Sequence, residues 1–197
     1  MSLDERRQLG LKALEIGEVE FDVLMAPLTV LGIGGPADVL VKVESLEALD
    51  RLKRWCRRER LPIAPVPRGP GLLIKDAGMR GVVVECAEVE GEGLSDAIAQ
   101  LDSKASSHDL SSDPEGLRIF FDPEGHRAED LIREAGLAGI RLRGARVSEK
   151  HPNVVINEGE ATARDVLALI DYLRRKVENR SGVKLKELIR VVGRDRP

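Results

Sequence analysis

A long polar segment separates the apolar parts of this 197-residue chain and limits what it can fold into. Residues 87–116 are rich in Glu, Gly, Ser and Asp, and their apolar periodicity nearly vanishes except between Ala97 and Leu101. A segment of this composition cannot bury enough apolar surface to fold alone. We therefore predict a polar linker over 87–116 that joins an N-terminal lobe, residues 1–86, to a C-terminal lobe, residues 117–197.

The first lobe has helical and strand-like patterns in alternation. A capping box at Ser2 and Glu5 predicts a helix that runs to about Ile16. A second helix is expected after Ser45, because apolar residues recur there at helical spacing. Short apolar runs with turn residues between them predict strands at residues 39–43, 63–66 and 82–84.

The second lobe has the same mixture. A helix is expected over residues 127–135, followed by a long amphipathic helix from Thr162 to Gly182. A strand pair brackets a polar loop, and the remaining strand-like runs are residues 117–121, 183–185 and 189–192. The chain is therefore predicted to be an α+β protein made of two small α+β lobes.

The charge is nearly balanced, with 31 Lys and Arg against 34 Asp and Glu. This balance gives no sustained basic face of the kind that captures nucleic acid, so nucleic acid is not a predicted partner. The basic run Arg51–Arg60 contains apolar residues at helical spacing. That spacing favours a solvated helix face over a phosphate or membrane patch.

Cysteines and histidines are few. With only Cys56 and Cys86, no secretory signal and no apolar run long enough to span a bilayer, we expect a cytoplasmic protein without a membrane span. The three histidines lie far apart in the sequence, with no Cys or carboxylate at ligand spacing, so no metal site is predicted.

The most informative stretch is Ala135–Asn157, where a polar loop lies between two short apolar runs. A loop held between strands is a common place for binding residues, so one interpretation is a contact surface for a nucleotide sugar or a flavin. The other is a capped turn, in which Ser and Asn satisfy nearby backbone groups while Lys and His lie in solvent. The candidate substrate-binding residues are Ser148, Lys150, His151, Asn153 and Asn157.

A second loop contains the adjacent glycines Gly34 and Gly35, followed by Pro36. Such residues let a backbone approach a phosphate, but they also form tight turns. A tight turn that leads into the strand at Val39 is the stronger interpretation, and contact with a ligand is the alternative.

Three stretches, taken in order, resemble the UDP-N-acetylenolpyruvoylglucosamine reductase family, also called UDP-N-acetylmuramate dehydrogenase. They are APLTVLGIGGPADVLVKVESLEAL, LLIKDAGMRGVVV and AGLAGIRLRGARVSEKHPNVVINEGEATARDVLALIDYLRRKV. The resemblance covers residues 26–84 and 120–193. Its most specific parts are GGPAD at Gly34–Asp38 and the VSEKH, Asn153 and Asn157 cluster.

The resemblance implies a fold with a first FAD-binding subdomain, a second flavin-binding subdomain and a C-terminal substrate domain. Residues 1–86 would then correspond to the first subdomain, and residues 117–197 to the C-terminal domain. Where the family has a stretch of domain size, this chain has only the polar segment. The second subdomain, with most of the flavin-embracing surface and the substrate-holding Tyr and Arg that the family implies, is therefore expected to be missing.

The resemblance also implies two proton donors. A family Ser or Cys ahead of an FKNP motif falls at Arg118 when that motif is aligned with Phe120–Pro123, and Phe121 then takes the place of the motif's Lys. A family Glu in a late strand falls at Leu188, with Glu187 one residue out of register. Arginine does not give up its proton usefully in proteins. No catalytic residue is therefore predicted.

A third implication concerns the flavin phosphates. The family's GGGSN turn, whose N–H groups would point at the pyrophosphate of FAD, corresponds here to Pro-Arg-Gly-Pro-Gly at residues 67–71. Proline has no N–H to donate, which would weaken binding by about 3–6 kcal/mol, and Arg68 would recover only part of this. No bound cofactor is expected. The candidate cofactor-binding residues are Gly34, Gly35, Arg68, Gly69 and Gly71.

Three hypotheses of function follow. The first is a catalytically inactive relative of the reductase, a pseudoenzyme that serves as a binding or assembly scaffold linked to peptidoglycan precursor synthesis, as a homodimer or on another cell-wall enzyme. The second is an active FAD- and NADPH-dependent enzyme whose missing subdomain comes from a partner chain. The third is a sensor that binds the UDP-sugar without converting it.

Overall fold

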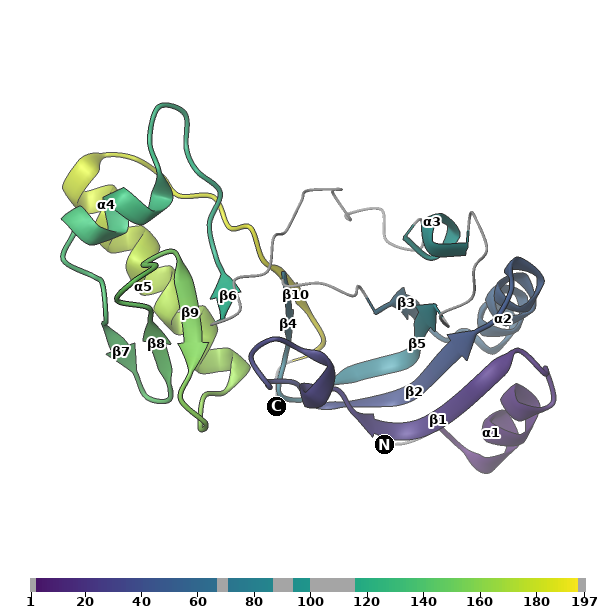
Figure 1. Cartoon of the computed structure of the whole chain (residues 1–197). Helices are drawn as coiled ribbons and strands as arrows, with labels where there is room; N and C mark the ends of the chain where they lie inside the picture. Colours follow the sequence, from purple (N-terminus) through teal and green to yellow (C-terminus); the bar gives the residue numbers. More distant parts are fainter. Residues whose placement is uncertain (1–2, 67–70, 87–93, 100–115, 195–197) are drawn as a thin grey trace. The chain divides into compact units, whose positions relative to one another are not determined.

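The computed structural model describes residues 3–66, 71–86, 94–99 and 116–194 (Figure 1). The chain forms two compact units, and each contains helices and strands, so the predicted α+β class is confirmed. Unit 1 comprises Met1–Leu24, Pro36–Arg68 and Gly78–His108, and unit 2 comprises Met25–Gly35, Gly69–Ala77 and Asp109–Pro197.

Unit 1 is a four-stranded sheet with helices packed against it. The strand order is β1-β2-β5-β3, with β1 antiparallel to β2, and with β2 and β3 parallel to β5. Helices α1 and α2 contact each other (Figure 1). The elements are α1 (Glu5–Lys12), β1 (Gly17–Leu24), β2 (Pro36–Val43), α2 (Leu46–Glu59), β3 (Ile63–Pro65), β5 (Met79–Cys86) and α3 (Leu94–Ala99).

Helix α2 shows how the sequence builds this unit. The Ser45 hydroxyl accepts a hydrogen bond from the Ala48 N–H at 3.1 Å and caps the first turn, and Arg60 ends the helix in a left-handed conformation. Each large apolar side chain that the helix buries against the sheet stabilises the unit by about 1.5–3 kcal/mol. The core includes Val39, Val41, Val43, Leu49, Leu52, Trp55, Val82 and Val84.

The N-terminal elements differ from the sequence prediction. Helix α1 is capped by Asp4, whose carboxylate accepts from the Arg7 N–H at 2.9 Å, and it ends at Lys12 instead of continuing to Ile16. The predicted capping residue Ser2 lies outside the described residues. The sequence analysis also missed β1, whose residues alternate between half-buried and exposed. That alternation is the usual pattern of a strand with one covered face.

Helix α3 lies inside the segment that we predicted to be a polar linker. Its Leu94 and Ile98 are buried and belong to the core of unit 1. The prediction is therefore wrong for these 6 residues, because two apolar side chains four positions apart are enough to attach a short helix to an existing core. The rest of that segment, except Gly116, lies outside the described residues.

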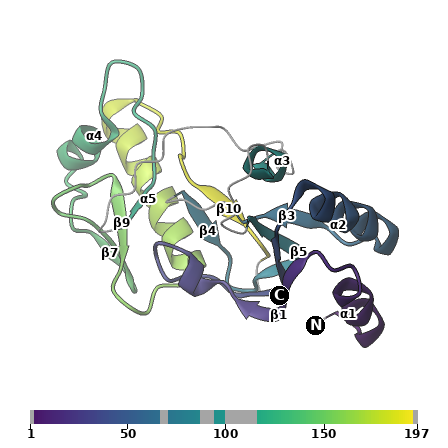
Figure 2. The same ribbon diagram turned by 45° about the vertical axis from the view of Figure 1, so that its right-hand side comes forward.

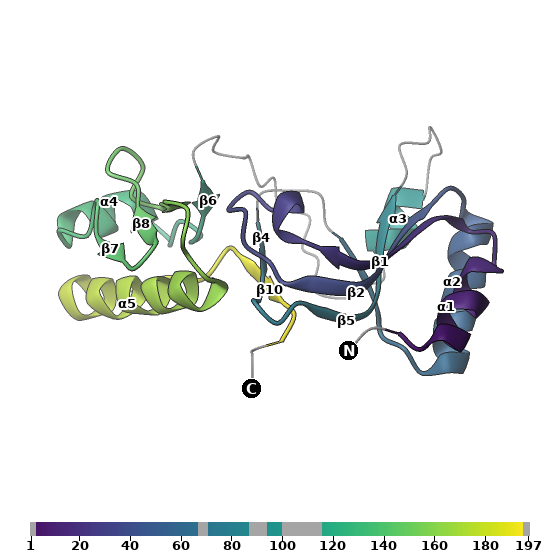
Figure 3. The same cartoon turned by 90° about the horizontal axis from the view of Figure 1, so that it is seen from below.

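Unit 2 combines an antiparallel sheet of order β6-β9-β8-β7 with two helices and a separate parallel pair, β4 and β10. Figure 2 shows β4 beside β10, and Figure 3 shows α5 along one side of the sheet. The elements are η1 (Ala26–Leu28), β4 (Leu72–Ile74), β6 (Leu117–Arg118), α4 (Ala128–Glu134), β7 (Arg141–Leu142), β8 (Ala145–Val147), β9 (Val154–Asn157), α5 (Ala163–Ser181) and β10 (Arg190–Val192).

The long helix α5 begins and ends where its capping residues predict. Thr162 and Asp165 form a reciprocal capping box, and Gly182 ends the helix with a φ of 73°. The hydrogen bonds from Thr162 and the charge of Arg143 hold the pKa of Asp165 below its usual value against the effect of its burial. None of the helices in the described ranges combines the length and the apolar composition that crossing a bilayer requires.

Two stretches of the predicted N-terminal lobe belong to unit 2. Residues 25–35 and 69–77 contribute Leu31, Ile33 and Leu73 to its core. Strand β4 pairs with β10, more than a hundred positions later in the chain. The boundaries 1–86 and 117–197 therefore do not separate the two units, because local patterns identify elements without identifying their partners.

Asp76 attaches one of these stretches to α5. Its carboxylate accepts from the Ala163 N–H at 2.9 Å and from the Arg164 N–H at 3.4 Å. We expect Asp76→Ala to lower the free energy of unfolding by about 1–2 kcal/mol, because two N–H groups of the first turn lose their acceptor. Urea unfolding followed by circular dichroism measures this change. The exposed Glu160 provides a control, and an equal loss in Glu160→Ala would contradict the capping role.

Candidate functional site

The predicted substrate loop is held together by its own side chains. The Ser148 hydroxyl accepts from the His151 N–H at 3.1 Å, and the Ser148 N–H donates to the carbonyl of Val154. The amide of Asn153 bonds both backbone groups of Phe120: its oxygen accepts from the N–H at 3.0 Å, and its nitrogen donates to the carbonyl at 2.8 Å. Ser148 and Asn153 are buried, so both side chains act as substitutes for backbone partners.

Asn157 has a similar role at the end of β9. Its amide nitrogen donates to the carbonyl of Leu31 at 2.8 Å, and its oxygen accepts from the N–H groups of Gly159 and Ala161. Asn157 therefore binds residues 25–35 to the sheet of unit 2. The hydrogen bonds of Ser148, Asn153 and Asn157 are those of the capped-turn interpretation.

The remaining two residues of this cluster are on the surface. Lys150 is exposed, and the His151 side chain is 40% exposed with its Nδ1 3.9 Å from a carboxylate oxygen of Glu129. These side chains are accessible to a ligand. The prediction that residues of this cluster contact a UDP-sugar stays a prediction.

The two positions matched to the family's proton donors lie on adjacent backbones. Arg118 is in β6, and its guanidinium forms an ion pair with Asp122 at 3.1 Å. Leu188 donates its N–H to the carbonyl of Ile119, the residue after Arg118, at 2.8 Å. The carboxylate of Glu187 pairs with Arg174 on α5 at 3.2 Å. The fold thus brings the two positions together, but neither residue is a proton donor.

The glycine loop is part of the packing of unit 2. A Cβ at Gly34 would lie 3.2 Å from both Ala26 N and the Ile74 Cβ, so a close backbone approach accounts for the glycine. The Gly35 N–H donates to the carbonyl of Lys75 at 3.2 Å. The carbonyl of Gly71 accepts from the Arg190 N–H at 2.8 Å. Arg68 and Gly69 lie outside the described residues.

These contacts bear on the cofactor that the resemblance implies. An N–H that already donates to a backbone carbonyl cannot also point at a pyrophosphate without losing that bond. The Gly35 N–H is therefore engaged within the protein, and the close backbone approach accounts for Gly34. Contact between this loop and FAD stays a prediction.

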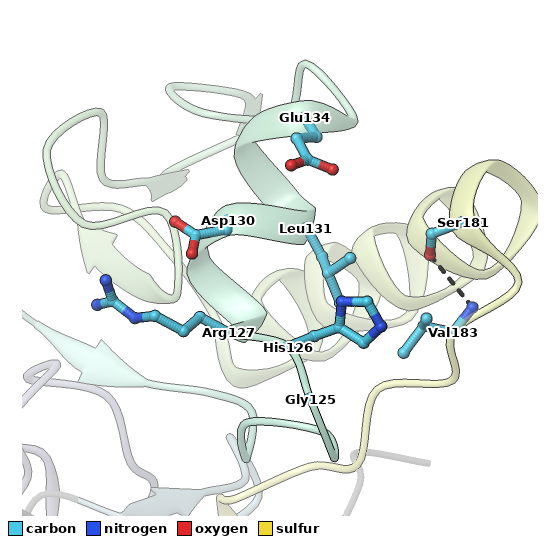
Figure 4. A pocket seen from close by; sticks show the side chains of 8 residues that line it. All are labelled: Gly125, His126, Arg127, Asp130, Leu131, Glu134, Ser181 and Val183. Atoms are coloured by element: carbon cyan, nitrogen blue, oxygen red, sulfur yellow. Dashed lines mark hydrogen bonds between the residues drawn. The ribbon is translucent and has the colours of Figure 1, made fainter.

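An open pocket of about 580 Å³ lies elsewhere in unit 2, between α4 and the end of α5 (Figure 4). The Ser181 hydroxyl on its rim accepts from the Val183 N–H at 3.2 Å. The sequence analysis did not predict this pocket, because its lining comes from a loop, a helix and a helix end that are distant in sequence. The lining residues are Gly125, His126, Arg127, Asp130, Leu131, Glu134, Ser181 and Val183.

Neither a cluster of metal ligands in the described ranges nor the thiol of Cys56 gives a further candidate. No three His, Cys, Asp or Glu side chains there gather in a way that could hold a metal ion. Cys56 is buried in α2, and its burial raises the pKa of the thiol to about 12. Such a thiol stays protonated at neutral pH and is a poor nucleophile.

A family model matches the part of the chain that contains this candidate site. Residues 111–192, which include the predicted substrate loop and both positions matched to the family's proton donors, match the family model described as UDP-N-acetylenolpyruvoylglucosamine reductase, C-terminal domain. The chain belongs to the UDP-N-acetylenolpyruvoylglucosamine reductase family. The resemblance inferred from the sequence is therefore confirmed.

Relatives extend the similarity to the rest of the chain. The reductase of Syntrophus aciditrophicus is 26% identical over 298 residues, which cover 94% of this chain and 95% of the relative. Reductase 2 of Symbiobacterium thermophilum is 35% identical over 161 residues, which cover 81% of this chain and 51% of the relative. The crystal structure of the reductase from Thermus caldophilus matches with a TM-score of 0.61 at 22% identity and covers 88% of this chain and 98% of that chain.

The alignment lengths show what this member of the reductase family lacks. The Syntrophus alignment has 298 positions, whereas this chain has 197 residues, and the alignment includes nearly all of both proteins. Roughly a hundred internal positions of the relative therefore have no counterpart here, which is the size of a small domain. The chain is a truncated form of the family fold, as its sequence predicted.

Proposed function

We propose that this chain is a non-catalytic member of the reductase family that serves as a binding or assembly scaffold linked to peptidoglycan precursor synthesis. One observation carries the proposal: the positions matched to the two proton donors are occupied by Arg118, which is paired with Asp122, and by Leu188. A guanidinium stays protonated and an isobutyl group cannot transfer a proton.

The missing internal region supports the same conclusion. The family implies that this region supplies most of the surface around the flavin, and roughly a hundred positions are absent. Loss of a domain leaves apolar surface that a partner or a second copy can cover. A homodimer, or attachment to another cell-wall enzyme, is the kind of assembly that we propose.

The test is to purify the full chain and measure its flavin absorption band, its oxidation of NADPH with UDP-N-acetylglucosamine enolpyruvate, and its mass by light scattering. We expect colourless protein, no NADPH oxidation above the blank and a mass above that of one chain. The double variant Arg118→Ser with Leu188→Glu is expected to stay inactive, because returning the acids does not return the flavin site.

Other outcomes would favour the alternatives. Yellow protein with substrate-dependent NADPH oxidation would overturn the proposal in favour of an enzyme, and activity only after a second protein is added would indicate a partner chain that completes the site. Heat released on titration with the UDP-sugar, without turnover, would indicate a sensor. A single-chain mass with no partner would remove the assembly role.

A further inference from the structure

Arginines gather on the exposed side of unit 1, at the C-terminal half of α2 and the neighbouring face of α1. The apolar stripe of α2, which includes Leu49, Leu52 and Trp55, is buried in the core of unit 1. The other side of the helix therefore projects its charged side chains outward. We call the following residues the basic surface: Arg6, Arg7, Arg51, Arg54, Arg57, Arg58 and Arg60.

One carboxylate holds three members of the basic surface. Glu59 lies 2.7 Å from a guanidinium nitrogen of Arg6, and 3.5 Å from both Arg7 and Arg58. These arginines, Arg6 first, hold the pKa of Glu59 below its usual value. Asp4 also lies 3.6 Å from Arg7, so two carboxylates face three guanidinium groups and the surface keeps a positive excess around these ion pairs.

The other members have no acidic neighbour in the described ranges. There, no carboxylate lies within ion-pair distance of Arg54, Arg57 or Arg60, and all three are exposed. Arg51 donates to the carbonyl of Glu15 at 2.8 Å. Cations in the last turn of a helix favour its dipole, which explains Arg57 and Arg58. This effect does not explain Arg54 or the two arginines on α1.

An apolar side chain stands beside these charges. Leu9 is 63% exposed, and it lies three residues after Arg6, hence on the same face of α1. Arginines beside an exposed leucine are compatible with a surface that lies against lipid head groups, where the arginines contact phosphates and the leucine enters the interface. A guanidinium can bind phosphate oxygens in a bidentate way.

We propose that the basic surface binds the face of a bilayer that contains anionic phospholipids, so that the protein is held at the membrane peripherally. The argument is one of charge complementarity. The arginines are spread over α1 and α2, and three of the seven, Arg54, Arg57 and Arg60, are exposed with no carboxylate within ion-pair distance in the described ranges. Such side chains suit head groups that move laterally to meet them. The net charge of −3 does not oppose this contact, because charges farther away than a Debye length are screened.

Sedimentation with vesicles tests the proposal. Vesicles of phosphatidylglycerol mixed with phosphatidylcholine are expected to carry the full chain down, whereas vesicles of phosphatidylcholine alone are not, and added salt should release the protein. The double variant Arg54→Gln with Arg57→Gln should reduce the partition coefficient on the order of tenfold or more. Its melting temperature should stay close to that of the wild type, because both side chains are exposed and the loss of one cation from the last turn of α2 costs only about 0.3–1 kcal/mol.

The matched control is Arg164→Gln with Arg180→Gln, which removes the same net charge from exposed positions of unit 2. It should bind vesicles like the wild type. The proposal is overturned if the wild type does not bind, if neutral vesicles bind equally well, or if both double variants lose the same affinity. Binding to an acidic peptide or to DNA, with none to vesicles, would also overturn it and would assign the surface to a different partner.

Discussion

Replacing Asn153 with alanine is expected to lower the free energy of unfolding by about 2–6 kcal/mol, because a buried donor and a buried acceptor each lose their partner, at about 1–3 kcal/mol apiece. Both groups belong to Phe120, which is fully buried in the core of unit 2. Urea unfolding at equilibrium gives the difference directly.

The matched control is Lys150→Ala in the same loop. Lys150 is exposed, and its change should stay within about 0.5 kcal/mol of the wild type. Should Asn153→Ala prove as stable as Lys150→Ala, the capped-turn interpretation of Asn153 would be wrong. A ligand contact would then be the better explanation for this asparagine.

Leu73→Ala should destabilise unit 2 selectively, although residue 73 lies in the stretch that the sequence assigned to the N-terminal lobe. Leu73 is fully buried in the same cluster as Phe120 and Leu169. Removing a buried leucine side chain costs about 3–5 kcal/mol, depending on how far the cavity collapses. Hydrogen exchange should therefore become faster in α5 while α2 keeps its protection.

Leu52→Ala supplies the mirror-image control. Leu52 is also fully buried, but it belongs to the core of unit 1. Its loss should speed exchange in α2 and leave α5 protected. If Leu73→Ala instead weakened α2 as much as α5, the assignment of residues 69–77 to unit 2 would be refuted.

The sequence predicted best those elements whose signals are local. Helix α2 starts after Ser45, and α5 lies between Thr162 and Gly182, because caps and apolar spacing act within a few residues. Strand β1 was missed although its alternation was visible, and α3 was missed because only two apolar residues mark it. Strand β4 pairs with a segment far along the chain, and no local pattern identifies that partner.

The candidate site shows a similar division. The pattern of polar residues between two apolar runs predicted the loop from Ser148 to Asn157. The family resemblance gave the positions of Arg118 and Leu188, and the structure places these two on adjacent backbones. It could not tell whether a polar side chain faces a ligand or the backbone of its own domain. The bonds of Asn153 and Asn157 involve Phe120 and Leu31, residues that the sequence gives no reason to connect with them.

Unit 2 is built from segments that are far apart in the sequence, which affects how it folds during synthesis on the ribosome. Strand β4 and the segment around Leu31 are synthesised early, but β10 and Asn157, to which they bind, emerge much later. Closing such long loops is slow relative to forming local contacts. Leu31 and Leu73 therefore lack their final contacts for most of translation. We expect chaperones to bind the nascent chain first at these exposed apolar residues.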